Sequence, residues 1–130
     1  MAWKFNDHEA VFIQIVNRLR SDILSGKYPP DSKFPPVRQL AYEAAVNPNT
    51  MQKALSELEW EKLLYTMRTA GRYVTEDAAL IGVLREQLAQ ERIIGLLNEL
   101  QQLGYQNEEI LNLLQRYMKG EIANDSVSGI

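Results

Sequence analysis

The sequence of 130 residues predicts a mainly α-helical fold that includes one small β-hairpin. Apolar residues recur three and four positions apart through most of the chain, which is the spacing of one helix face. Two short runs rich in aromatic and β-branched residues flank a glycine-containing turn near residue 70. A long stretch rich in leucine and isoleucine follows from residue 80. These observations predict three helices and a hairpin, followed by a separate helical region.

The first two helices are predicted from apolar spacing and from their boundaries. Gly26 is expected to end the first helix. Pro36 is expected to begin the second, because proline is tolerated in a first turn. The apolar positions of the first helix are Phe12, Ile15, Val16, Leu19 and Ile23. Those of the second are Val37, Leu40, Ala41 and Ala44.

The third helix is expected to begin at Asn47 as N-cap, with Pro48 in its first turn, and to run to about Lys62. Its buried stripe comprises Met51, Ala54, Leu55 and Leu58. Its opposite face presents Asn49, Thr50, Gln52, Lys53 and Ser56. Residues 65–67 and 72–75 then read as two short strands joined by a turn. This order of elements predicts a winged helix-turn-helix in residues 1–76.

Composition limits the classes of protein that fit. The chain has no cysteine, which excludes disulfides and thiolate metal sites. It shows neither a signal-peptide pattern nor an apolar run long enough to span a membrane, so we expect a cytoplasmic protein without a membrane partner. Residues 1–75 hold ten Lys/Arg and eight Asp/Glu, whereas residues 76–130 hold four and nine. A polyanionic partner is therefore expected to meet the first half.

The N-terminal end of the third helix lacks acids, although the helix dipole would stabilise an acid there. The first acids are Glu57, Glu59 and Glu61. The second helix of a helix-turn-helix enters the major groove of DNA with its N-terminal end, where carboxylates would meet phosphates. We therefore predict that this end contacts double-stranded DNA.

The exposed residue types at this end suit DNA. Asn49 and Gln52 are candidates for base edges, because amides can bind adenine N6 and N7 together. Thr50 and Lys53 are candidates for phosphate oxygens. The full set of predicted DNA-binding residues is Arg38, Asn47, Pro48, Asn49, Thr50, Gln52, Lys53, Arg68, Thr69, Gly71 and Arg72.

Each of these assignments has a structural alternative. Asn47 and Pro48 also form an ordinary helix start. Arg38 also fits a solvated arginine, and Arg68 and Arg72 also fit cations that keep an exposed hairpin soluble. Their joint placement around one predicted surface favours the DNA interpretation.

Residues 77–120 are expected to form two helices. Gly104 separates them, Asn107 is expected to cap the second, and residues 121–130 are expected to be a disordered tail. Two helices cannot bury so much leucine and isoleucine against each other alone. We therefore expect a small helical dimerisation domain, with a homodimer formed through residues 77–119.

Two other classes of function fit the sequence less well. An enzyme is disfavoured, because the only histidine is His8 near the N-terminus and no catalytic, cofactor or metal motif is present. A winged-helix protein-interaction module without DNA binding remains the alternative. Binding of an unknown small-molecule effector is a further possibility. Its pocket would be lined by aromatic residues, although aromatic residues at such positions more often belong to the hydrophobic core. Those residues are Trp60, Tyr65, Tyr73 and Tyr105.

These motifs, in this order and spacing, resemble the DNA-binding domain of the GntR family of bacterial transcription regulators over residues 10–75. The matching segments are Val11-Phe12-Ile13-Gln14-Ile15, Leu19-Arg20, Ile23, Gly26, Pro35-Pro36-Val37-Arg38-Gln39-Leu40-Ala41, Val46-Asn47-Pro48-Asn49-Thr50-Met51-Gln52-Lys53-Ala54, Leu58-Glu59 and Gly71-Arg72-Tyr73-Val74. The short helical remainder is similar to the YtrA-type subfamily, whose regulators are dimeric repressors often encoded beside ABC transporters. The resemblance implies a dimeric repressor, encoded beside a transporter, whose contacts with operator DNA are Arg38, Asn49, Thr50, Gln52, Lys53 and the wing from Arg68 to Arg72. Two recognition helices held about one DNA turn apart, ~34 Å, would match a palindromic operator.

The chain departs from the family pattern at four places. Asp31 stands where the family usually has glycine, and Pro36 stands where a capping serine is usual. The wing reads Thr69-Ala70-Gly71-Arg72 instead of Gly-x-Gly-Thr, and Lys53 replaces a commoner arginine. Lysine cannot bind a phosphate with the two-pronged geometry of arginine.

Overall fold

The computed structural model describes residues 2–121, so the tail expected at 121–130 lies outside the described residues from position 122 onward. Internal contacts divide the chain into two compact units. The division falls after Glu86, within helix α4 (Ala78–Gln102). Each unit is described by itself.

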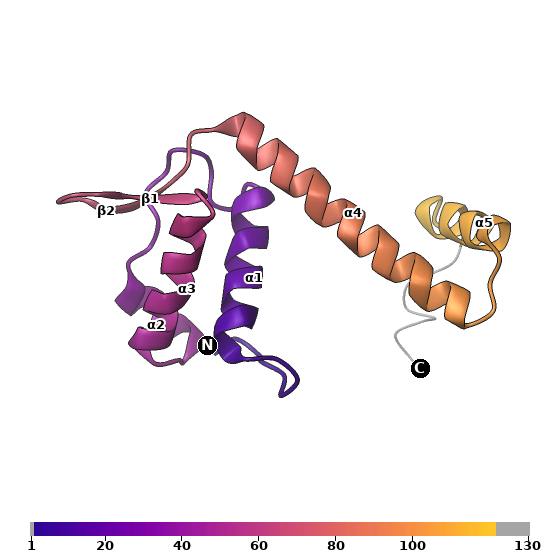
Figure 1. Cartoon of the computed structure of the whole chain (residues 1–130), viewed down its shortest axis with the longest axis horizontal. Coiled ribbons are helices and arrows are strands. Elements are labelled where there is room, and N and C mark those ends of the chain that lie inside the picture. The colour runs from indigo at the N-terminus through magenta and orange to yellow at the C-terminus, as the bar shows by residue number, and fades with distance from the viewer. Residues whose placement is uncertain (1, 122–130) are drawn as a thin grey trace. The chain divides into compact units, whose positions relative to one another are not determined.

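Three helices form the body of the first unit: α1 (Val11–Leu24), α2 (Val37–Ala44) and α3 (Pro48–Trp60). Helix α3 packs against both α1 and α2, and α1 and α3 lie side by side (Figure 1). Full burial of one large apolar side chain contributes about 1.5–3 kcal/mol, so this shared core holds the three helices together. The core residues of the helices are Ile15, Val16, Leu19, Ile23, Leu24, Leu40, Ala41, Ala44, Met51, Ala54, Leu55 and Leu58. The predicted stripes are thus confirmed, except that Phe12 and Val37 are only half-buried.

The ends of the helices explain where each one stops. Ala45 ends α2 in the left-handed conformation with φ 58°, and Val46 N–H donates to the Ala41 carbonyl at 3.0 Å. Helix α3 ends two residues before the predicted Lys62, because Lys62 adopts φ 72°. The N–H of Leu63 then donates back to the Leu58 carbonyl at 3.0 Å, which turns the buried Leu63 into the core.

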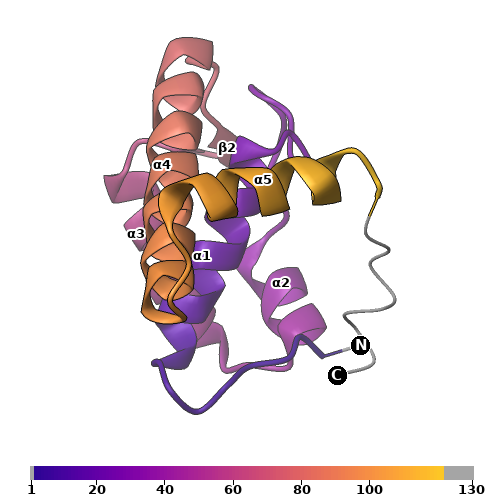
Figure 2. The same ribbon diagram turned by 90° about the vertical axis from the view of Figure 1, so that its right-hand side faces the viewer.

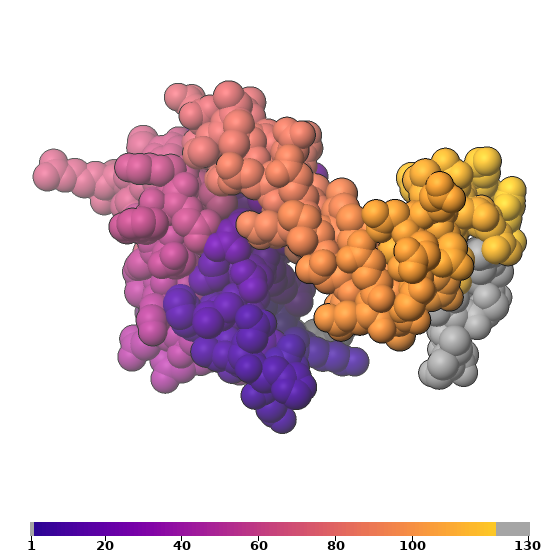
Figure 3. All heavy atoms as spheres, turned by 45° about the vertical axis from the view of Figure 1, so that its right-hand side comes forward, coloured from indigo at the N-terminus to yellow at the C-terminus, as the bar shows by residue number. Residues whose placement is uncertain are grey.

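A two-stranded antiparallel hairpin, the wing, follows the three helices. It consists of β1 (Leu64–Met67) and β2 (Gly71–Val74), with each strand beginning one residue earlier than predicted. Residues 32–34 run beside β2: the Phe34 N–H donates to the Arg72 carbonyl at 2.8 Å. The tip of the wing stands out from its unit as a narrow projection (Figure 3).

The second unit contains the rest of α4 and helix α5 (Asn107–Met118). In Figure 2, α5 turns away from the direction of α4. The expected N-cap at Asn107 is wrong by one residue, because Gln106 occupies that position. Gln106 and Glu109 form a reciprocal capping box, in which the Gln106 N–H donates to Glu109 Oε1 at 2.8 Å. Among residues 87–121, only Ile110 is buried.

Candidate nucleic-acid interface

The N-terminal end of α3 is shaped by its cap. The side-chain oxygen Oδ1 of Asn47 accepts the backbone N–H of Asn49 at 2.7 Å, and Pro48 occupies the first helical position. Proline lacks an N–H, so it leaves one fewer unpaired donor there. The first turn contains no acidic residue. The remaining free N–H groups and the helix dipole therefore give this end a partial positive charge. Residues 47–53 are called the helix tip below.

The helix tip presents its predicted contact residues to solvent. Asn49, Gln52 and Lys53 are exposed, whereas Thr50 is half-buried. Met51, between them, is fully buried. The helical period thus turns the apolar side chains into the core and leaves the amide and ammonium groups outside. Within the first unit, no other element covers these exposed side chains.

Two of the exposed side chains make weak contacts within the first unit. The Lys53 ammonium lies 4.4 Å from the centroid of the Phe12 ring on α1. The Gln52 side-chain amide lies 3.5 Å from the Ser56 hydroxyl. A cation over an exposed aromatic ring gains about 0.5–1 kcal/mol. Both groups can therefore exchange these contacts for a stronger partner.

The predicted contact residue on α2 also lies at the surface. Arg38 is exposed in the first turn of α2, whose N-cap Pro36 makes no side-chain hydrogen bond. Because α2 packs on α3, the structure holds Arg38 in the same unit as the helix tip. The structure gives Arg38 no ion-pair partner among the salt bridges of the described residues.

The wing residues differ from one another in exposure. Arg68 and Thr69 are exposed in the turn, and Gly71 is exposed with φ 89°. A residue other than glycine would be strained at such a φ, which explains why glycine stands at this position. Arg72 is different. Its side chain is only 17% exposed, and its Nε donates to Glu59 Oε1 at 2.5 Å.

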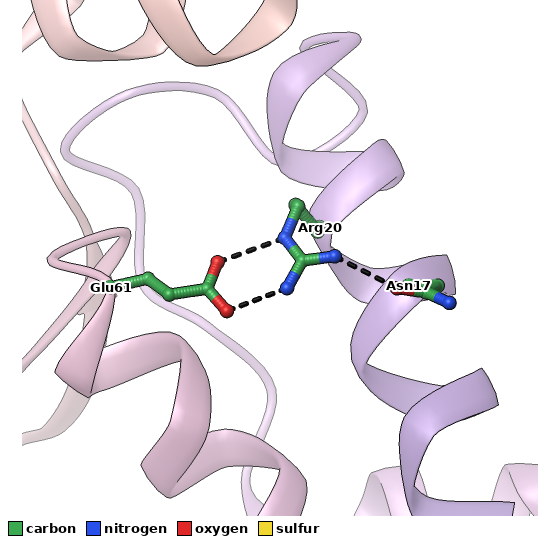
Figure 4. Close-up of polar contacts among 3 residues, drawn as sticks. All are labelled: Asn17, Arg20 and Glu61. Atoms are coloured by element: carbon green, nitrogen blue, oxygen red, sulfur yellow. Dashed lines mark hydrogen bonds and ion pairs between the residues drawn. The ribbon is translucent and has the colours of Figure 1, made fainter. Parts of the chain in front are cut away.

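The acids near the C-terminal end of α3 are used inside the protein. Glu61 forms a two-pronged ion pair with Arg20 of α1, with Nε–Oε1 at 2.8 Å and Nη2–Oε2 at 2.6 Å (Figure 4). Nη1 of Arg20 also donates to Asn17 Oδ1 at 2.8 Å. This pair fixes the end of α3 to α1. Local sequence pattern could not reveal it, because the partners are 41 residues apart.

A residue with a strained backbone lies beside the wing. Asp31, which replaces a glycine of the family pattern, has φ 61°. Its Oδ1 accepts the Tyr65 hydroxyl at 2.8 Å. This hydrogen bond raises the pKa of Tyr65, with smaller contributions from desolvation and from neighbouring acids. The hydrogen bond to the wing offsets part of the backbone strain at Asp31.

The aromatic residues considered for an effector pocket are spread over the described chain. Tyr65 and Tyr73 stack across the wing with centroids 5.8 Å apart. Trp60 is 80% exposed, and Tyr105 lies in the second unit. Tyr105 therefore belongs to a different unit from Trp60, Tyr65 and Tyr73.

His8 is exposed in the segment before α1. No group of three metal-ligating side chains forms among the described residues. None of the helices in this part of the chain is long and apolar enough to cross a membrane.

Comparison with known proteins identifies the family. Residues 13–74 match the model of the bacterial regulatory proteins of the gntR family. The chain is 36% identical to the HTH-type transcriptional repressor YtrA of Bacillus subtilis over 86 residues, covering 62% of this chain and 66% of that protein. Two solved structures are also similar. A GntR family transcriptional regulator from Listeria monocytogenes has a TM-score of 0.80 and 34% identity, covering 86% of this chain and 98% of its own. The DNA-binding domain of AraR, solved in complex with operator ORX1, has a TM-score of 0.50 and 26% identity, covering 58% and 92%.

The fold and these similarities agree. The family match runs from the third residue of α1 to the end of β2, so it includes both the helix tip and the wing. The similarity to the regulator from Listeria extends over nearly the whole of that protein. The chain therefore belongs to the gntR family of bacterial regulatory proteins, which are DNA-binding transcriptional regulators and not enzymes.

Proposed function

We propose that this protein is a sequence-specific repressor that binds operator DNA with the helix tip in the major groove. One observation carries the proposal: the tip combines a capped, acid-free helix start with exposed Asn49, Gln52 and Lys53. Groups of this kind can bind bases and phosphates without bringing a carboxylate to the DNA.

The proposed roles follow from side-chain chemistry. The amides of Asn49 and Gln52 contact base edges, where each can donate and accept a hydrogen bond. Lys53 leaves the Phe12 ring and binds a phosphate, and the Thr50 hydroxyl binds a phosphate oxygen. Arg38 contacts the backbone or a guanine.

The remaining tip and wing residues are proposed to shape and extend this contact. Asn47 and Pro48 set the start of the helix, so that its first N–H groups face the duplex. Arg68, Thr69 and Gly71 form the end of the wing, which reaches the neighbouring minor groove or its phosphates.

We propose that the second unit makes the protein a homodimer. Large apolar side chains are exposed on both of its helices, which an isolated chain in water would not favour. A second copy covers such a surface with a self-complementary contact. The exposed apolar residues are Ile93, Ile94, Leu96, Leu103, Tyr105, Leu111 and Met118. Two copies then hold two helix tips about one DNA turn apart, roughly 34 Å, which matches a palindromic operator.

The regulatory setting is proposed from the family. Similarity to a protein named as a repressor supports repression by this chain. Control of a transporter operon is carried by the resemblance to the YtrA-type subfamily. Response to a small-molecule effector is carried only by the aromatic residues that could line a pocket, Trp60, Tyr65, Tyr73 and Tyr105. A bacterial repressor would act in the cytoplasm, where its operator lies.

The function is tested by selecting bound DNA from a random pool with the purified protein. We expect enrichment of an inverted repeat with half-sites one turn apart. Gln52→Ala should relax specificity at one base position, because one base contact is lost. Lys53→Ala should weaken all sequences alike and reduce the salt slope by about one. Lys27→Ala, at an exposed site just after α1, is the matched control and should change neither property.

Other outcomes distinguish the alternatives. If no sequence is enriched, the protein is a winged-helix interaction module and the DNA proposal is wrong. If a single half-site is enriched, the symmetry is wrong although DNA binding stands. The dimer is tested separately by sedimentation equilibrium at micromolar concentration. The parent should be a dimer, and the double variant Ile93→Glu, Leu103→Glu should be a monomer; a monomeric parent would exclude this interface.

A further inference from the structure

A single carboxylate connects the two strands of the wing to α3. The Thr66 hydroxyl on β1 donates to Glu59 Oε2 at 2.9 Å. On β2, Arg72 Nε donates to Glu59 Oε1 at 2.5 Å. Thr66 and Arg72 are direct partners in the register of the hairpin. The two oxygens of one glutamate therefore hold a cross-strand pair.

The position of Arg72 separates it from the other wing cation. The Arg72 side chain is 17% exposed and that of Glu59 is 29% exposed, so solvent screens their ion pair only partly. The Arg72 backbone carbonyl is also bound, by the Phe34 N–H at 2.8 Å. Arg68, by contrast, is exposed in the turn. To bind a phosphate with Nε, Arg72 would have to leave Glu59 and expose that carboxylate close to the DNA.

We propose that Glu59 and Arg72 are positioning residues that fix the wing at one orientation relative to α3. This inference rests on the proposed function and assigns two different roles to the residues of the wing. The turn containing Arg68, Thr69 and Gly71 reaches the DNA, whereas Arg72 stays with Glu59 and holds that turn in place. The orientation of the wing then determines how far its tip lies from the groove that the helix tip enters. Arg72, which the sequence predicts as a DNA contact, thereby acts through the wing.

The proposal is tested on DNA with the full chain and its selected operator. The variants are Arg72→Met, Glu59→Gln and their double variant. Arg68→Met is the control for a phosphate-binding cation. Glu57→Gln is the control for loss of one negative charge on the same helix. Melting curves recorded first identify any variant that does not fold.

The expected results distinguish a positioning role from a phosphate contact. Arg72→Met should lower affinity about tenfold with the salt slope of the parent, whereas Arg68→Met should reduce the slope by about one. Glu59→Gln should bind more weakly than Glu57→Gln, and the double variant should bind like Arg72→Met alone, because both changes remove the same pair. The proposal is overturned if Arg72→Met reduces the slope by about one and Glu59→Gln binds more tightly than Glu57→Gln.

A measurement without DNA separates this proposal from the proposed function. Amide hydrogen exchange of Tyr65 and Tyr73, the register pair next to Thr66 and Arg72, should accelerate at least fivefold in Glu59→Gln and stay unchanged in Glu57→Gln and Arg68→Met. Thr66→Val, which removes only the hydroxyl contact, should give a smaller acceleration. Unchanged exchange in Glu59→Gln would refute the positioning role of Glu59. If the parent selects no DNA, the proposed function fails while the exchange result still decides whether Glu59 orders the wing.

Discussion

Replacing the N-cap of α3 by an acid tests why the helix tip lacks carboxylates. Asn47→Asp keeps the capping geometry, because the aspartate oxygen can also accept the Asn49 N–H, which lies 2.7 Å from Asn47 Oδ1. Aspartate and asparagine are about equally good caps. The added charge also interacts favourably with the helix dipole, by about 0.3–1 kcal/mol. The variant should therefore be at least as stable as the parent.

The same substitution should weaken DNA binding. A carboxylate about 6 Å from each of two phosphates costs about 1.4 kcal/mol in total at the dielectric constant of water. That energy corresponds to about a tenfold loss of affinity. Asn47→Asp should raise the melting temperature by about 1–4 °C, measured at fixed protein concentration, while it lowers operator affinity. Stability and function are expected to change in opposite directions.

Fluorescence anisotropy with the selected operator and a thermal melt measure the two effects. Lys27→Gln is the matched control, because it changes the net charge by the same amount at an exposed position just after α1. It should leave affinity nearly unchanged. If Asn47→Asp binds the operator as tightly as the parent, the acid-free tip is not an adaptation to DNA. If it is destabilised, the assignment of Asn47 as a simple oxygen cap is wrong.

Three further predictions concern stability. Lys62→Gly should raise the free energy of unfolding by about 0.5–1 kcal/mol in urea, because Lys62 has φ 72° and glycine adopts this conformation without strain; a loss of stability would contradict this. Arg20→Met should lower it by about 1–2 kcal/mol, because the two-pronged pair with Glu61 is mostly shielded from solvent; a change below about 0.5 kcal/mol would show that the pair is dispensable. The raised pKa of Tyr65 favours its neutral form in the folded protein. The stability that its hydrogen bond with Asp31 contributes is therefore present below pH 10 and is lost as pH rises through the raised pKa. Tyr65→Phe should flatten that decline in unfolding measurements above pH 10, and an unchanged decline would exclude Tyr65 as its source.

The sequence predicted most of the fold because its main signals are local. The apolar spacing of α1 and the Asn47-Pro48 start of α3 each depend on residues within a few positions of one another. The helix tip was predictable for the same reason, since a cap, a missing acid and a polar face all belong to one helix. By contrast, Phe34 is fully buried although it belongs to no periodic run, since a lysine precedes it and two prolines follow it. No local pattern marks it as core.

The contacts that orient the candidate site could not be predicted from local sequence pattern. Arg20 pairs with Glu61 from 41 residues away, and Arg72 pairs with Glu59 from 13 residues away. Such pairs depend on how α1 and the wing pack against α3, and charge alone gives no preference for one partner. The end of α3 was misplaced for a similar reason. Lys62 is a good helix former, but Leu63 must reach the core, and that requirement overrides local propensity.

The charges of α3 are divided along its length. Its N-terminal half is free of carboxylates, and two acids near its C-terminal end pair with cations of the same protein: Glu59 with Arg72 and the C-cap Glu61 with Arg20. These acids are consequently neutralised in the folded chain and add little to the field at the helix tip. The acidic excess of residues 76–130 lies in a different part of the chain. A formal net charge of -3 is therefore compatible with binding a polyanion, because the sign of the local field at the tip matters more than the sum over the chain.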